Sequence, residues 1–427
     1  MDRRWTASLV IAFGLYGCTA ETPLEPLPVD ELLTYEEVTV DVREAQGRDG
    51  QWLLCRRVPT DPFLDHARFL AGDGTLGPRI DFDALPRLVE NVQFNEEDIW
   101  ITELLPLGDG GVVLLGMGIQ RDLEDRLHLV MYQLNASLGL VGAPLRRFVR
   151  SRVDLGIRDD IDRAYDAKAL GCFLGSNAQQ VAAVVRSNSN GLAERRLFVL
   201  PRTSASSLAT SVAIPFADTD HDLQFMLTDP SAPDHVWLGL DTTGAGAGTA
   251  LLVQRIDLSQ QVPLVVDQGI AQARNTQVND AVAKGSGLVL VGHAEPDQAG
   301  QLRPFMASLS SAGSIDVALT FLEIETERSV CAYAVDATVE PAWVGLSLYE
   351  QAIMTDELRR EDLFGDLRVC RVTTNGGISD ERTLIPGQGL RPLAIHERGG
   401  EAWVIGVLHP FLNVDLLHSF SITSSAP

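Results

Sequence analysis

A short run of apolar residues recurs seven times along the chain, and a polar stretch follows each copy. Most copies close on a glycine, as in GVVLLG at 111–116, LVLVG at 288–292 and WVIG at 403–406. The copies end at residues 55, 116, 185, 239, 292, 345 and 406, so successive copies lie 61, 69, 54, 53, 53 and 61 residues apart. The copy near 185 lacks the glycine. Self-similarity at a nearly fixed period indicates a repeated structural unit.

Each copy has similar neighbours. Another apolar run lies about ten residues before it, and an alternating apolar–polar run follows it, for example at 127–132, 250–256 and 303–309. Period-two alternation is typical of strands with one buried face. A weaker fourth strand ends each unit, and only 356–363 could form a short helix. The pattern therefore predicts units of four short antiparallel strands.

Four-stranded units of this length resemble the blades of a β-propeller, the fold in which such sheets surround a central channel. Seven copies predict seven blades over a domain at 32–427. The resemblance is to propellers at large, because the double glycine of kelch repeats and the Trp-Asp signature of WD repeats are missing. Two stacked β-sandwiches are the alternative, and the pattern leaves open whether there are six or seven blades.

The last unit predicts how the ring closes. Its first three strands fall near 393–396, 402–408 and 416–422, and the chain then ends without a fourth. We predict that Leu32 to Val38 supplies the missing strand, which would remove an exposed sheet edge.

The N-terminus has the pattern of an export signal at 1–17. Arg3 and Arg4 precede an apolar stretch at 5–15, which is too short to span a bilayer as a helix. The following residues, Leu15-Tyr16-Gly17-Cys18, resemble the lipobox of bacterial lipoproteins, although Tyr16 stands where a small residue is usual.

That resemblance implies cleavage before Cys18 and attachment of lipid to it, with a proline-rich tether at 18–31 leading to the folded domain. The partner would then be a membrane of the cell envelope. Thr19 in place of Asp favours the outer over the inner membrane in this family. The alternative is an ordinary cleaved signal and a secreted protein.

Charge and cysteine usage exclude some functions. The formal net charge of −24 disfavours nucleic acid as a partner and favours a soluble, monomeric domain. The four cysteines beyond Cys18 show no metal-ligand spacing. Cys331 and Cys370 are the pair that we expect to bridge if a disulfide forms, and buried free thiols are the alternative.

Candidate site residues lie where the first strands begin, because these strands line the channel of a propeller. The polar residues at these places are Asp98, Lys168, His221, Asp222, Asn279, Asp280, Arg328 and Arg391. Such a ring could bind a polar ligand or a metal. The alternative is that these residues are polar because channel mouths are wet.

Asp218, Asp220 and Asp222 form the densest carboxylate cluster and could bind calcium, which prefers oxygen ligands. The run lacks the glycine and distal glutamate of an EF-hand loop, so a solvated connector is the alternative. We predict no other cofactor.

Catalytic motifs are missing from the sequence, including the G-x-S-x-G elbow. We therefore favour a binding or scaffold module for a protein or glycan, presented by long loops such as 347–366. The alternative is a hydrolase or lyase with a metal held in the channel by Asp98, Asp222, Asn279 and Asp280.

Overall fold

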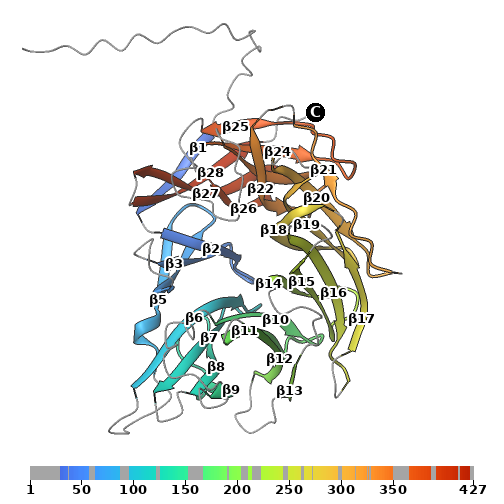
Figure 1. Cartoon of the computed structure of the whole chain (residues 1–427). Coiled ribbons are helices and arrows are strands. Elements are labelled where there is room, and N and C mark those ends of the chain that lie inside the picture. The colour runs from blue at the N-terminus through green and yellow to red at the C-terminus, as the bar shows by residue number, and fades with distance from the viewer. Residues whose placement is uncertain are drawn as a thin grey trace, which may run out of the picture.

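The computed structural model describes residues 29–423 apart from 37, 57–62, 87–95, 122–125, 152–166, 190–191, 203–209, 214–222, 244–248, 261–263, 272, 297–300, 313, 325, 327, 350–364, 386–390 and 412–413. These residues form seven antiparallel sheets of four strands each. The sheets are arranged as blades around a central axis (Figure 1). The predicted seven-bladed β-propeller is confirmed.

Blades 1 to 3 follow the chain from the inside of the ring outwards. Blade 1 contains β2 (Val38–Glu44), β3 (Gly50–Arg56), β4 (His66–Ala71) and β5 (Leu76–Asp81), and the short 3-10 helix η1 (Phe82–Ala84) follows it. Blade 2 contains β6 (Glu96–Pro106), β7 (Val112–Arg121), β8 (Arg126–Leu134) and β9 (Leu145–Ser151). Blade 3 contains β10 (Lys168–Leu174), β11 (Gln180–Ser189), β12 (Leu192–Pro201) and β13 (Thr210–Ala213).

Blades 4 to 7 repeat the arrangement. Blade 4 contains β14 (Leu223–Thr228), β15 (His235–Thr243), β16 (Thr249–Asp257) and β17 (Leu264–Ile270). Blade 5 contains β18 (Arg274–Lys284), β19 (Gly287–Glu295), β20 (Arg303–Leu309) and β21 (Thr320–Phe321). Blade 6 contains β22 (Ser329–Asp336), β23 (Ala342–Tyr349), β24 (Gly365–Val372) and β25 (Arg382–Ile385). Blade 7 contains β26 (Arg391–Arg398), β27 (Glu401–Phe411) and β28 (Val414–Thr423), with β1 (Val29–Glu36) outermost.

The recurring apolar runs are the second strands of the blades, and their alternation builds the core. In β3, Trp52 and Leu54 pack with residues of blade 2, whereas Leu53 and Cys55 pack with residues of blade 7. One strand thus contributes side chains to two cores, because successive side chains point to opposite faces of a sheet. This explains why the second strands are apolar at nearly every position and not only at alternate ones.

The ring closes through the two ends of the described chain. β1 pairs antiparallel with β28, from Val29 opposite Ile422 to Glu36 opposite Leu416. Figure 1 shows the blue β1 beside the red strands of blade 7. The predicted closure is confirmed, although the strand begins at Val29 rather than Leu32, and Val38 already belongs to β2.

A β-bulge interrupts the first strand of six blades at the same depth in the ring. In each of these blades one extra residue lies between the paired positions. In blades 1, 2, 4, 5, 6 and 7 these residues are, in order, Val40, Thr102, Gln224, Asn279, Tyr333 and Leu393. The recurring glycine lies opposite the bulge in five of these blades, for example Gly292 opposite Val278. A Cβ on Gly292 would lie 1.9 Å from the carbonyl oxygen of Gln277, so the close approach of the two strands requires glycine. Blade 3 has an unbroken register from Lys168 to Leu174 and lacks the glycine.

The structure shows no disulfide between Cys331 and Cys370. Both are buried thiols outside any disulfide, as are Cys55 and Cys172, which is the alternative that the sequence left open. Cys331 lies on β22 and Cys370 on β24, with β23 between them. Two strand spacings of about 4.8 Å separate such residues, beyond the Cα distance of about 7 Å that a disulfide can bridge.

The part of the chain that the structure describes contains no helix long and apolar enough to span a bilayer. The predicted signal at 1–17, Cys18 and most of the tether lie outside the described residues.

Candidate functional site

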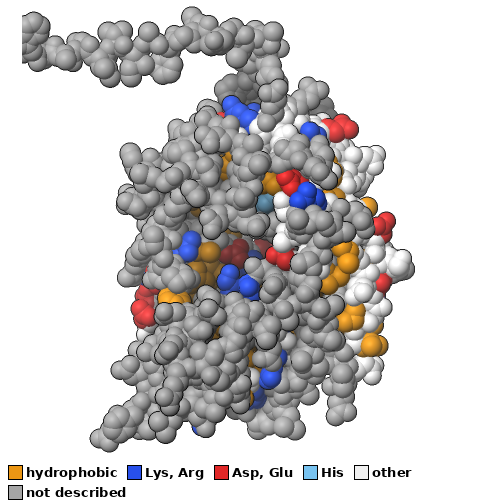
Figure 2. Space-filling model, viewed as in Figure 1, with side chains coloured by type: hydrophobic (Ala, Val, Ile, Leu, Met, Phe, Trp, Pro, Cys, Tyr) orange, Lys and Arg blue, Asp and Glu red, His pale blue; other side chains and the backbone are white. Residues whose placement is uncertain are grey.

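The central channel is a cavity of about 1350 Å³, and all seven blades contribute residues to its lining. Acidic and basic side chains gather around the hollow at the centre of the ring (Figure 2). We call the end that carries the turns between first and second strands the hairpin face, and the opposite end the loop face. The first strands run from the loop face to the hairpin face, so the channel wall is built from β2, β6, β10, β14, β18, β22 and β26.

Arg43 and Glu103 form the main ion pair of this lining. Arg43 donates from Nε to Glu103 Oε1 at 2.9 Å and from Nη2 to Oε2 at 3.2 Å. Its Nη2 also lies 2.8 Å from Asp41 Oδ2. Burial raises the pKa of Glu103, and Arg43 offsets part of that rise. Burial lowers the pKa of Arg43, but the carboxylates of Asp41 and Glu103 together raise it by more than burial lowers it. The pKa therefore lies above its ordinary value, and the guanidinium stays charged.

An acidic residue directly follows the bulge in blades 1, 2 and 5. These residues are Asp41, Glu103 and Asp280, and each accepts a hydrogen bond from the backbone N–H of the next residue at 2.8, 3.1 and 2.8 Å. A bulge disrupts the hydrogen-bond ladder of the strand locally. The carboxylates therefore provide local acceptors for amides beside the bulges, which is a structural reason for acids at this depth.

Asp280 also joins two blades. Its Oδ2 accepts a hydrogen bond from the backbone N–H of Val335 in blade 6 at 2.9 Å. Burial raises the pKa of Asp280 to about 6, although the amides of Val335 and Ala281 act in the opposite direction. Both oxygens are thus committed to backbone amides.

We expect Asp280 to make the stability of the protein depend on pH. Its folded-state pKa lies above that of an unfolded aspartate, so its contribution is present at low pH and is lost as the pH rises through about 6. From about pH 5 to about pH 7.5 the wild type should lose about 1 kcal/mol more unfolding free energy than Asp280→Asn does. Urea unfolding of both proteins at the two pH values measures this difference, because His293 and the other titrating groups are common to both. Equal pH dependence in the two proteins would contradict the assignment.

Asn279 fixes the tautomer of a buried histidine in the lining. Its Nδ2 donates to the carbonyl oxygen of Ala332 at 2.7 Å and lies 3.1 Å from His293 Nδ1. Because Nδ2 is a donor, His293 Nδ1 accepts and the ring proton resides on Nε2. Burial lowers the pKa of His293 to about 4, so the ring is neutral at neutral pH.

Other bulged residues also link neighbouring blades. Thr102 Oγ1 donates to the carbonyl oxygen of Ala169 at 2.9 Å and lies 3.1 Å from its amide nitrogen, which joins blade 2 to blade 3. Gln224 donates to the carbonyl oxygen of Thr276 and accepts from the amide of Val278, which joins blade 4 to blade 5. The polar residues at the bulges therefore hold the inner ring together.

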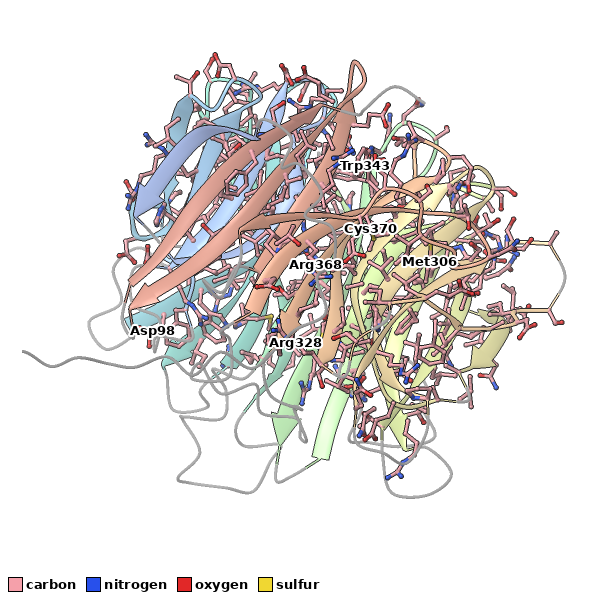
Figure 3. The ribbon with its side chains drawn as sticks, turned by 90° about the horizontal axis from the view of Figure 1, so that it is seen from above. Asp98, Met306, Arg328, Trp343, Arg368 and Cys370 are labelled. Atoms are coloured by element: carbon pink, nitrogen blue, oxygen red, sulfur yellow. The ribbon has the colours of Figure 1, made fainter. Side chains whose placement is uncertain are left out.

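The structure places three of the predicted residues, Lys168, Asn279 and Asp280, in the channel lining. The other described candidates lie elsewhere. Arg328 pairs with Asp366 at 3.3 Å, and the Arg391 guanidinium stacks 5.5 Å from the Tyr333 ring centre. Asp98 lies on β6 towards the same end of the molecule as Arg328 (Figure 3). His221, Asp218, Asp220 and Asp222 lie outside the described residues.

Much of the charged lining lies outside the residues predicted from the sequence, including Asp41, Arg43, Glu103 and His396. The sequence pattern places the predicted residues at the beginnings of the first strands, whereas these four lie beyond the bulges. The signal that could have found them is a charged residue inside an otherwise apolar first strand, such as Glu103 within 99–105.

Metal and thiol chemistry have little support in this lining. Within the described residues, no group of three or more His, Cys, Asp or Glu side chains could hold a metal ion. The calcium prediction at 218–222 falls outside them. Cys172 lines the channel, but burial raises its pKa to about 12, so it is not a thiolate at neutral pH.

Comparisons with known proteins identify no family for this chain. No protein-family model matches the chain, and no curated protein matches it. Among solved structures, one from a study of two prolyl endopeptidases and their inter-domain dynamics is 10% identical, with a TM-score of 0.41. It is matched over 89% of this chain and 46% of its own, so this chain spans about half of its length. A subtype N11 neuraminidase-like protein of A/flat-faced bat/Peru/033/2010 (H18N11) is 7% identical with a TM-score of 0.35, over 91% of this chain and 99% of its own. What is established for this chain is the seven-bladed β-propeller fold itself.

Proposed function

We propose that this protein is a non-enzymatic binding module that holds its ligand in the central channel and is attached to the cell envelope by a lipid on Cys18. The observation that carries the proposal is the channel itself, a cavity of about 1350 Å³ with a charged lining drawn from every blade. Concave cavities with a few placed polar groups are the usual sites of ligand binding. The partner is a glycan or a protein segment thin enough to enter the channel.

The state of the polar groups supports binding rather than catalysis. The carboxylates of Glu103 and Asp280 are each engaged in fixed hydrogen bonds within the ring. His293 is neutral, and its Nδ1 is occupied by Asn279. Groups fixed in this way can orient a ligand, whereas a general acid or base must be within hydrogen-bond reach of the proton that it transfers. The oxygens of Glu103 and Asp280 are already occupied by groups of the ring.

A channel-blocking variant tests the proposal. Gln277 is exposed and lines the channel, so Gln277→Trp should narrow it without disturbing the core. The matched control is Gln268→Trp, because Gln268 is also an exposed glutamine on a strand but lies on the outermost strand of blade 4. The purified proteins are tested on an array of oligosaccharides and peptides. We expect the wild type to bind some members of the array, and the control variant to bind the same members.

We expect Gln277→Trp to weaken those binders by at least about tenfold while its thermal unfolding matches that of the control. Equal binding by the two variants would rule out the channel as the site. The attachment is tested in the same cells by growth with labelled palmitate. Label should enter the wild type and not Cys18→Ser, and a labelled Cys18→Ser protein would refute lipidation at that residue.

A further inference from the structure

Blade 3 departs from the pattern of the ring in one way that no other blade shares, because its first strand has no bulge between Lys168 and Leu174. Its second strand also lacks the recurring glycine, as does that of blade 1. Gly171 lies instead on the first strand, where a Cβ would meet Leu115 Cδ1 of blade 2 at 2.3 Å. Where one unit of a repeat breaks a rule that the others keep, a specialised role is the first explanation to test.

Blade 3 also carries a row of positive charges across three neighbouring strands. Lys168 on β10 lies directly opposite Arg186 on β11, and Arg186 lies directly opposite Arg195 on β12. Residues that are directly opposite share one face of the sheet and lie about 5 Å apart. We call these three residues the cation row.

The position of the cation row follows from its neighbours. Val184 and Leu197 lie two residues along from Arg186 and Arg195, and both pack in the apolar core that blade 3 shares with Met226 and Leu238 of blade 4. The row therefore lies on the face towards blade 4, at the loop-face end of that core, because Lys168 begins its strand. Lys168 and Arg186 line the channel, whereas Arg195 is buried.

Like charges that are directly opposite destabilise a sheet. Three in a row are unexpected in a chain whose formal net charge is −24, where a carboxylate is the commoner choice. All three side chains have other interactions within the protein. The distinctive feature of the row is therefore its concentration of positive charge at one place and not any vacant donor.

The carboxylates of the channel are not free to neutralise the positive charge of the cation row, because they are already bound to other groups. Asp41 and Glu103 are engaged by Arg43, and Asp280 by two backbone amides. Asp241 accepts a hydrogen bond from Gln224. The negative charge of the lining is thus largely committed to structure, while the positive charge is gathered on one blade at the mouth.

We propose that the cation row binds an oligoanion, a ligand with two or more carboxylate or phosphate groups, at the loop-face mouth of the channel. Lys168 and Arg186 would contact the ligand, and buried Arg195 would add its charge from behind them. The arginine fork of Arg186 and the ammonium group of Lys168 suit such oxygens, since arginine pairs with carboxylate and phosphate in a bidentate manner. Two cations on neighbouring strands suit an anion that carries more than one charged group. The proposal rests on the proposed function, because it assigns a chemical class to the ligand of the channel.

Calorimetric titration at about 50 mM salt tests the row, since low ionic strength preserves such contacts. The probes are trigalacturonate, which carries carboxylates, and tripolyphosphate, which carries phosphates, with acetate as a single-charge comparison. The double variant is Lys168→Gln with Arg186→Gln. Arg195 is retained because it is buried, and its loss could prevent folding. The control is Arg303→Gln with Arg328→Gln, which removes the same formal charge from blade 5 and from the residue just before blade 6.

We expect the wild type and the control to bind at least one of the two probes, and the probe that binds distinguishes carboxylate from phosphate ligands. The double variant should bind that probe at least about tenfold more weakly and keep its thermal unfolding midpoint. If neither probe binds the wild type, or if the double variant binds as the control does, the proposal is wrong. Neutral ligands whose binding is sensitive to Gln277→Trp would in that case leave the proposed function intact, so the two failures are distinguishable.

Discussion

A chain that begins at residue 38, without β1, is expected to lose more than about 4 kcal/mol of unfolding free energy, a loss beyond that of ordinary single substitutions. β1 supplies the outermost strand of blade 7 and pairs with β28 along its whole length. Without it, β28 becomes an open edge, and the contact between the two ends of the ring is lost. Chemical unfolding of the two purified chains, one beginning at Val29 and one at Val38, measures the effect.

If the shorter chain does not fold, adding the missing strand as a separate peptide still tests the closure. A synthetic peptide of residues 29–36 should bind the shorter chain and restore its cooperative unfolding, because β1 is held to blade 7 by hydrogen bonds with β28. The same peptide with proline at position 33 should fail, since proline removes a backbone donor from the strand. A shorter chain as stable as the longer one would show that closure by β1 is not needed.

Replacing Arg43 by methionine should cost about 3 to 5 kcal/mol of unfolding free energy at neutral pH. Glu103 is only 3% exposed, and the substitution would leave its carboxylate buried without a cation. The cost should shrink as the pH falls, because a protonated Glu103 carries no charge to bury. Urea unfolding at several pH values measures both effects.

Two controls separate this effect from a loss of packing. The double variant Arg43→Met with Glu103→Met removes both charges and should recover most of the lost stability. Lys284→Met breaks the exposed ion pair with Glu340, whose side chains are 35% and 49% exposed, and should cost less than about 1 kcal/mol. If Arg43→Met costs no more than Lys284→Met, the Arg43–Glu103 pair does not stabilise the ring.

The number of blades could be predicted because the second strand of every blade has a recognisable apolar pattern in the sequence. Second strands are buried on both faces, as in Gly287–Glu295, so they appear as unbroken apolar runs. Closure was predictable because the last unit showed three strand patterns where the other units show four, and 32–38 offered the fourth. The start of β1 was misplaced by three residues, since the proline-rich tether gives no clear boundary before Val29.

The channel lining was predicted less well, for a physical reason. Side-chain alternation shows which face of a strand is buried, but a bulge shifts that alternation by one residue. Asp41 and Glu103 follow bulges at Val40 and Thr102, which local sequence does not mark. The sequence could not exclude a bridge between Cys331 and Cys370, because an apolar environment around these residues does not reveal the strand that separates them.

The pairing of Val29 with Ile422 brings the first and last described strands to the same point on the outer edge of blade 7. A protein or label fused ahead of β1 would therefore leave the molecule beside one fused after β28, and a short linker could join the two ends. A circular permutant opened at the tight turn between β18 and β19 would keep every blade intact, since that turn lies on the hairpin face. A surface that holds this protein by its N-terminal segment would hold it at the edge of one blade, to the side of the axis along which a ligand enters.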